Sequence, residues 1–148
     1  MSISVKQISA EATLLLRCAI LRPGLPVSES CFPNDAADGA AHFGAYDDDA
    51  LVAVGSIFIE DHDQFPGAGV WRLRGMAVAA ERQGQGLGRL ILEACHQHIR
   101  SAGGGQLWCN ARCSAKAFYD KAGYVTHGEP FDIPGISLHV LMSRAIEG

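Results

Sequence analysis

The chain has 148 residues, of which 48% are hydrophobic and 19% charged, so it suits one globular domain rather than a disordered or coiled-coil chain. Its 16 acidic and 12 basic residues give a net charge of −4, which offers no general attraction for nucleic acid or an anionic membrane. The five cysteines, an odd number, favour free thiols in a reducing, cytoplasmic compartment. The longest apolar run near the N-terminus is far too short for a signal peptide or a membrane span.

The first half of the chain predicts strands around one short helix. Ser9 is placed to cap a helix that ends at Arg22–Gly24, because leucines and small residues follow it at helical spacing. Residues 25–41 carry prolines without periodicity and predict a structured loop with a possible helical turn. Asp47–Asp49 predicts a solvated hairpin turn rather than a metal site. The expected strands span Ser2–Lys6, His42–Tyr46, Leu51–Ile59 and Val70–Val78.

The second half alternates helices and strands. Gly86–Arg100 is the clearest helix, and its apolar stripe places His98 in the core and His96 toward solvent. The strand–helix–strand order predicts that Gln106–Asn110 runs parallel to the Val70–Val78 strand. Later elements are a helix capped by Ser114, running to Ala122 and ended by Gly123, and then strands over Tyr124–Gly128 and Ile136–Ser143.

A glycine-rich turn, Gln83-Gly84-Gln85-Gly86-Leu87-Gly88-Arg89, stands between a predicted strand and the strongest helix. Alternate glycines at a helix N-terminus expose backbone N–H groups to which a diphosphate can bind. The alternative is a turn that needs small residues only for packing. The turn lacks the Gly-Lys-Ser/Thr of a P-loop and the third glycine of a dinucleotide-binding fingerprint, so neither class of nucleotide site is expected.

The sequence resembles the GNAT superfamily of N-acetyltransferases at two segments. Gln83–Gly88 matches the family motif Gln/Arg-x-x-Gly-x-Gly/Ala, and Ala115–Tyr124 is similar to its Ala-x-x-Phe-Tyr-x-Lys-x-Gly-Phe/Tyr segment. The resemblance covers nearly the whole chain. It implies a single α/β domain over residues 1–148, with a mixed, mostly antiparallel sheet that splays between its fourth and fifth strands and is flanked by helices.

The resemblance also implies an acyl-CoA, usually acetyl-CoA, between the splayed strands. Backbone groups of Met76 and Val78 would pair with the pantetheine and the acyl carbonyl. Asn110 is similar in position to a frequent polar contact of the family, although a turn-forming role is the alternative. The remaining cofactor-binding residues implied by the motif are Gln83, Gly84, Gln85, Gly86, Leu87, Gly88 and Arg89.

Acyl transfer to an amine needs a base for the amine proton and an acid for the leaving thiolate. Tyr119 matches the family's usual acid, with a core tyrosine as the alternative. No spacing selects the base, which could be a water relay or one of Glu60, Asp61, His62, His42 and His139. Cys109 and Cys113 leave open a covalent acyl-cysteine route, which we do not favour because neither has a neighbouring histidine. The scattered cysteines and histidines make a poor zinc pattern, so we expect no metal.

These observations predict a cytoplasmic enzyme that transfers an acetyl group from acetyl-CoA to the amine of a small molecule or peptide by direct attack. Residues 22–41 and 129–135 are the expected walls of the acceptor side. The alternatives are a non-catalytic acyl-CoA-binding regulatory module and an interaction domain without a CoA site. If the chain forms an oligomer, we expect a symmetric homodimer on general grounds.

Overall fold

One seven-stranded sheet organises the chain in the computed structural model, which describes residues 2–148. The strand order is β1-β2-β3-β4-β5-β7-β6, and the β4–β5 pair alone is parallel among the described strands. This confirms the predicted α/β class and the mixed sheet. The strands are β1 (Ile3–Ile8), β2 (Ala41–Asp47), β3 (Ala50–Ile59), β4 (Val70–Val78), β5 (Gly104–Arg112), β6 (Val125–Ile133) and β7 (Ser137–Glu147).

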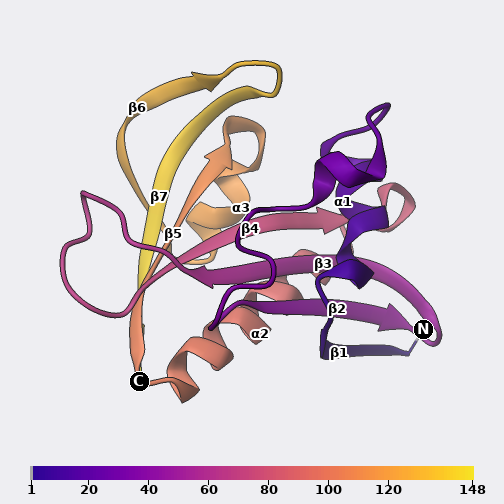
Figure 1. Cartoon of the computed structure of the whole chain (residues 1–148), viewed down its shortest axis with the longest axis horizontal. Helices are drawn as coiled ribbons and strands as arrows, with labels where there is room; N and C mark the ends of the chain where they lie inside the picture. Colours follow the sequence, from indigo (N-terminus) through magenta and orange to yellow (C-terminus); the bar gives the residue numbers. More distant parts are fainter. Residues whose placement is uncertain (1) are drawn as a thin grey trace.

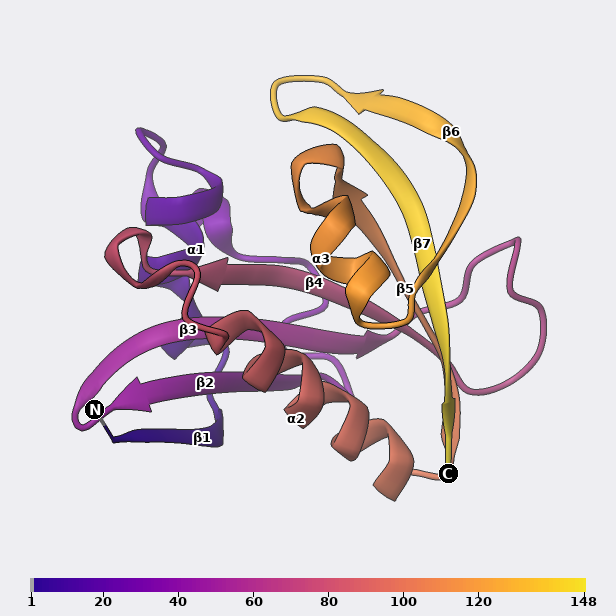
Figure 2. The same cartoon turned by 180° about the vertical axis from the view of Figure 1, so that it is seen from behind.

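Helices cover both faces of the sheet. Helix α2 (Leu87–Ser101) packs across β2 and β3 on the face seen in Figure 2, and α1 (Leu14–Leu21) packs against β4 on the opposite face (Figure 1). Helix α3 (Lys116–Lys121) lies beside β5. Short 3₁₀ turns η1 (Glu11–Thr13), η2 (Val27–Ser30), η3 (Ala80–Arg82) and η4 (Cys113–Ala115) complete the elements. None of the helices in residues 2–148 is long and apolar enough to cross a membrane.

The sheet splays between β4 and β5. Their ladder consists of three residue pairs at the start of both strands, the last of which joins Arg72 to Trp108. Beyond that pair β4 continues to Val78 and β5 to Arg112 without pairing to each other. Figure 1 shows β5, β7 and β6 diverging from the four strands of the first half. The splay predicted from the sequence is therefore present, and it leaves two strand edges free to meet a ligand.

A bulge in β4 changes which face its side chains occupy. Gly75 has φ +72°, and the register against β3 shifts between Val54 and Ser56, where β4 has one extra residue. Arg74 consequently lies beside Phe32 on the face of α1, whereas Met76 approaches Ile91 of α2 across Gly55. A Cβ at Gly75 would meet Phe32 at 2.9 Å and Arg17 Nε at 3.0 Å, so glycine is required here.

Three local expectations differ from the structure. His96 is buried rather than solvent-facing, because Tyr124 and Arg144 cover that side of α2. His98 is only half-buried, edge-on to the rings of Phe43 and Trp71. Ser114 lies inside η4, and α3 begins without a side-chain cap.

The predicted C-terminal strands are too short. Strand β6 extends to Ile133 because its last residues pair with the start of β7 beyond a register shift between His127 and Phe131, and β7 extends to Glu147 because its last residues pair with β5. The end of α3 agrees with the sequence, since Gly123 has φ +87° there and Tyr124 N–H donates to the Tyr119 carbonyl at 3.0 Å.

Candidate active site

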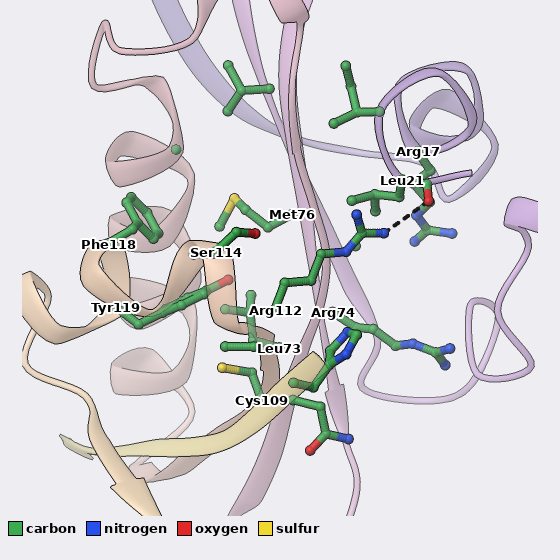
Figure 3. A pocket seen from close by; sticks show the side chains of 18 of the residues that line it. Arg17, Leu21, Leu73, Arg74, Met76, Cys109, Arg112, Ser114, Phe118 and Tyr119 are labelled. Atoms are coloured by element: carbon green, nitrogen blue, oxygen red, sulfur yellow. Dashed lines mark hydrogen bonds between the residues drawn. The ribbon is translucent and has the colours of Figure 1, made fainter. Parts of the chain in front are cut away.

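A cavity of about 720 Å³ occupies the gap between the splayed strands (Figure 3). It runs from the glycine turn before α2, past β4 and β5, to the face where α1 lies. Both expected acceptor-side segments contribute to its wall, the first through Phe32 and the second through Ile133. Of the predicted cofactor-binding and catalytic residues, only Gln85 does not line this cavity.

The glycine turn presents open backbone to the cavity. Gly84 has φ +81° and Gly86 has φ +80°, conformations that other residues adopt at a cost. No heavy atom lies within 4 Å of a Cβ built at either glycine, so the turn does not need them for packing. Gly88 differs, because a Cβ there would contact the Phe118 ring at 3.4 Å. Gly88 alone of the three lies close to a neighbouring side chain, while Gly84 and Gly86 fit an anion-binding turn.

Side chains around the turn hold its shape. The Gln83 amide donates to the Val78 carbonyl at 3.2 Å, and Arg82 Nε donates to the Gln85 side-chain oxygen at 2.9 Å. Arg82 also pairs with Asp47 at 2.9 Å, while Arg89 is 79% exposed at the start of α2. Two arginines therefore flank the turn, and each is paired with a carboxylate, Arg82 with Asp47 and Arg89 with Glu93 at 4.0 Å.

These features fit the phosphate and pantetheine parts of an acyl-CoA. The open left-handed glycines leave room for a diphosphate at the amides of the turn. The edge of β4 beyond Arg72 has no strand partner on the β5 side, so backbone groups near Met76 can bind an extended amide chain. Asn110 and Met76 line the same cavity.

Tyr119 is buried yet directed at the cavity. The residue is 6% exposed, and Figure 3 shows its hydroxyl pointing from α3 toward the open space beside Ser114 and Met76. Burial raises the pKa of Tyr119 well above its ordinary value of 10, and Cys109 and Cys95 act in the same direction. The phenol is therefore protonated near neutral pH, as a general acid must be.

The cysteines beside Asn110 do not favour a covalent route. Cys109 lines the cavity, but burial raises the pKa of its thiol to about 12. A thiol at neutral pH is a poor nucleophile, since the thiolate is the reactive form. Cys113 does not contribute to the cavity wall. Direct attack by the acceptor is thus the simpler chemistry for this site.

Four of the five candidate bases do not line the cavity, and three of these four make contacts with other side chains. His42 uses both ring nitrogens, on Ser56 Oγ at 2.7 Å and the Asp35 carbonyl at 3.0 Å. Glu60 pairs with Arg72 at 3.0 Å, and His62 packs on the Trp108 ring. Among the five, His139 alone lines the cavity, and Asp61 does not.

His139 has one ring nitrogen available. It is 5% exposed on β7, opposite Arg112 of β5. Its Nδ1 lies 2.8 Å from the Ser137 carbonyl, which can only accept a hydrogen bond. In the neutral ring the proton therefore resides on Nδ1, and Nε2 keeps a lone pair that can accept a proton.

A group of arginines was not anticipated from the sequence. Side chains from α1, the following loop, β4 and β5 meet at the end of the cavity away from the glycine turn, and this group is called the arginine cluster below. No aspartate or glutamate of the described chain lines the cavity. No local signal in the sequence could reveal the cluster, since its members are far apart along the chain. The arginine cluster comprises Arg17, Arg22, Arg72, Arg74 and Arg112.

Arg17 anchors the loop before β2 beneath this cluster. Its side chain is 1% exposed and forms two hydrogen bonds with the Asp35 carboxylate, at 2.8 and 3.0 Å. It also donates to Ser56 Oγ at 3.0 Å, which joins it to His42. The Arg17 guanidinium keeps the pKa of Asp35 below its ordinary value, although burial opposes this effect. Asp35 therefore stays ionised and balances the buried charge.

Across residues 2–148, no three His, Cys, Asp or Glu side chains gather in a way that could hold a metal ion. The described cysteines are all free thiols.

Comparisons with known proteins agree with this geometry. The family model described as "Acetyltransferase (GNAT) domain" matches residues 27–144. The "Uncharacterized N-acetyltransferase YitI" of Bacillus subtilis (strain 168) is 34% identical over 144 residues, which cover 97% of each chain.

Two solved structures share the fold. The ribosomal-protein-S18-alanine N-acetyltransferase of Escherichia coli is 16% identical, with a TM-score of 0.77 over 99% of this chain and 96% of that one. Escherichia coli ElaA is 20% identical, with a TM-score of 0.75 over 97% and 99%. At these identities the likeness concerns the fold.

Proposed function

The chain belongs to the GNAT acetyltransferase family and is an acyltransferase, and from that premise we propose that it transfers an acetyl group from acetyl-CoA to a primary amine of a small molecule or peptide. The acceptor attacks directly, without an acyl-enzyme. The observation that carries the proposal is that one cavity joins an open glycine turn, a neutral buried phenol and an available imidazole nitrogen.

The donor side of the cavity holds the coenzyme. Backbone amides from Gly84 to Arg89 bind the diphosphate, and backbone groups of Met76 and Val78 other than the Val78 carbonyl bind the pantetheine chain at the edge of β4. Asn110 adds a polar contact from β5. Because the Gln83 side chain occupies the Val78 carbonyl, we assign Gln83 to shaping the turn. Acetyl-CoA, when bound, supplies the activated thioester.

Tyr119 and His139 carry out the two proton transfers of the reaction. His139 Nε2 accepts the proton that the amine must lose, since Nδ1 is held by the Ser137 carbonyl. The Tyr119 hydroxyl donates the proton that the departing thiolate requires, and its raised pKa keeps that proton available. One C–N bond forms and one C–S bond breaks; His139 takes one proton from the amine and Tyr119 gives one to the thiolate, so the products are a neutral amide and CoA thiol, and proton exchange with solvent restores both side chains. Backbone N–H groups near Met76 polarise the carbonyl under attack.

The test is a panel of primary amines incubated with the protein and acetyl-CoA, with free CoA thiol as the readout. We expect amine-dependent release of CoA. His139→Gln should lower kcat by about 100-fold, within the range for a lost general base. His127→Gln is the matched control, since His127 bonds Ser143 and does not line the cavity.

A non-catalytic binding module gives a different result. Acetyl-CoA would then raise the melting temperature of the protein, but no amine in the panel would release CoA. A protein that acetyl-CoA does not stabilise at millimolar concentration would refute both functions.

A further inference from the structure

The arginine cluster makes the acceptor end of the cavity strongly positive, although the whole protein carries a net charge of −4. Two of its five members are neutralised by carboxylates outside the cavity. Arg17 pairs with Asp35 at 2.8 Å, and Arg72 pairs with Glu60 at 3.0 Å. The other three, Arg22, Arg74 and Arg112, form no ion pair within the described residues.

Arg74 is the clearest example of a positive charge in the cluster without a paired carboxylate. Its guanidinium carbon lies 4.0 Å from the centroid of the Phe32 ring, and that of Arg17 lies 3.9 Å from the same centroid. Burial lowers the pKa of Arg74 to about 10, and the charge of Arg72 acts in the same direction. Glu60 opposes the shift only in part. A half-buried positive charge among like charges is costly unless an anion joins it.

Arg112 crosses the cavity to reach a neutral partner. Figure 3 shows its side chain extending from β5 toward α1, where Nη2 donates to the Leu21 carbonyl at 3.0 Å. A guanidinium has five N–H donors, and this bond uses one of them. The remaining donors make no other hydrogen bond within the described residues, and Arg112 lines the same cavity as Arg74. A planar fork of this kind matches the two oxygens of a carboxylate or phosphate.

We propose that the acceptor amine carries an anionic oxygen group, a carboxylate or a phosphate, and that Arg74 and Arg112 bind this group. The inference rests on the proposed acetyltransferase function and adds the class of its acceptor. Binding the anion at a fixed point places the amine near the reacting end of the cavity.

The coenzyme's own phosphates are accounted for elsewhere. The diphosphate site at the glycine turn has its own arginines, Arg82 and Arg89. Arg74 lies on the other side of the Gly75 bulge, facing α1 rather than α2. The bulge therefore separates the arginine cluster from the diphosphate site, so the coenzyme's diphosphate does not account for Arg74.

The experiment compares matched acceptors in steady-state kinetics. One arm uses phenylalanine, its carboxamide and phenethylamine, and the other uses phosphoethanolamine and ethanolamine. We expect kcat/KM at least tenfold higher for one charged member than for its neutral partners. The arm that shows the preference identifies carboxylate or phosphate. Equal use of charged and neutral amines in both arms would overturn the proposal while leaving the acetyltransferase function intact.

Variants separate recognition from a purely structural role. Arg74→Gln and Arg112→Gln should each raise the KM of the preferred charged acceptor at least tenfold, with the KM of its neutral partner unchanged. The KM of acetyl-CoA should stay within about twofold. Arg74→Lys should recover part of the loss, because it keeps the charge but not the fork. Arg100→Gln, which removes an arginine outside the cavity, is the matched control.

A binding measurement that needs no catalysis distinguishes lost anion binding from misfolding of a variant. With CoA at saturation, acetate or inorganic phosphate at constant ionic strength should raise the melting temperature of the wild type but not of Arg74→Gln. An equal rise in both proteins would overturn the assignment. A wild type that does not bind CoA at all would instead refute the proposed function.

Discussion

His96 Nε2 lies 2.7 Å from the Tyr124 hydroxyl, joining the middle of α2 to the segment that follows α3. The Arg144 guanidinium donates to His96 Nδ1 at 3.3 Å, so the ring proton resides on Nε2 and is donated to Tyr124. One neutral imidazole thus connects three elements of the second half of the chain. Its neutrality has a consequence for stability.

Acid should weaken the fold through His96. Burial, assisted by the nearby arginines Arg144 and Arg100, lowers the pKa of His96 from 6.5 to about 4. The unfolded chain therefore binds a proton between pH 6.5 and 4 that the folded protein does not, and stability falls as the pH falls through this range. The loss amounts to as much as about 3 kcal/mol.

Urea unfolding across this pH range checks the prediction. His96→Gln should flatten the dependence, and His98→Gln, which changes a half-buried neighbour on the same helix, should not. An unchanged slope in His96→Gln would show that other groups cause the acid sensitivity.

Removing the Tyr119 hydroxyl should slow the reaction without weakening coenzyme binding. Tyr119→Phe keeps the ring but deletes the proposed acid, so kcat should fall by about 100-fold, within the usual range for general acid catalysis. The KM of acetyl-CoA should change less than twofold. Tyr124→Phe is the control, because Tyr124 is equally buried but does not line the cavity. Similar rates for both variants would exclude Tyr119 as the acid.

Two neighbouring glycines should respond differently to alanine. Gly86→Ala forces a left-handed conformation at φ +80°, which costs about 1–2 kcal/mol, and should raise the KM of acetyl-CoA. Gly88 lies within α2, and its new Cβ would meet Phe118 at 3.4 Å. Gly88→Ala should therefore change stability by less than about 1 kcal/mol, given the better helix propensity of alanine. Thermal unfolding and acetyl-CoA titration measure both effects, and equal responses would contradict this division.

The Arg17–Asp35 pair should be costly to break. Asp35→Asn leaves a guanidinium that is 1% exposed without its carboxylate, and losing one partner of a buried pair costs about 3–5 kcal/mol. Asp35 itself is 13% exposed, so we expect the lower end of that range. Asp38→Asn in the same loop, at an exposed position, should have little effect. Chemical denaturation of the two variants compares them directly, and equal stabilities would refute the role of the pair.

The parts of the fold that could be predicted depend on local signals. Glycine spacing marks the turn before α2, and the strand–helix–strand order makes β4 and β5 parallel neighbours. Gly123 ends its helix by the conformational rule that favours glycine there. The confirmed family resemblance supplied the splay, which no local pattern encodes.

The missed features depend on contacts between distant residues. The polar side of α2 suggested solvent for His96, but Arg144 of β7 and Tyr124, three residues beyond the end of α3, cover that side. The apolar stripe of α1 gave no hint that Arg17 is buried, because its partner Asp35 lies in an aperiodic loop. Residues from five segments form the arginine cluster and the His139 site, so only the folded chain brings them together.

The short β4–β5 ladder divides the sheet into two parts, β1 to β4 and β5 to β7. Three residue pairs form the strand pairing between the first four strands and the last three, and the Arg112–Leu21 hydrogen bond crosses the gap at its far end. Coenzyme and acceptor would fill the space between these two parts. We expect the protein with both substrates bound to resist deformation along this gap more than the empty protein, because the substrates would contact both strand edges.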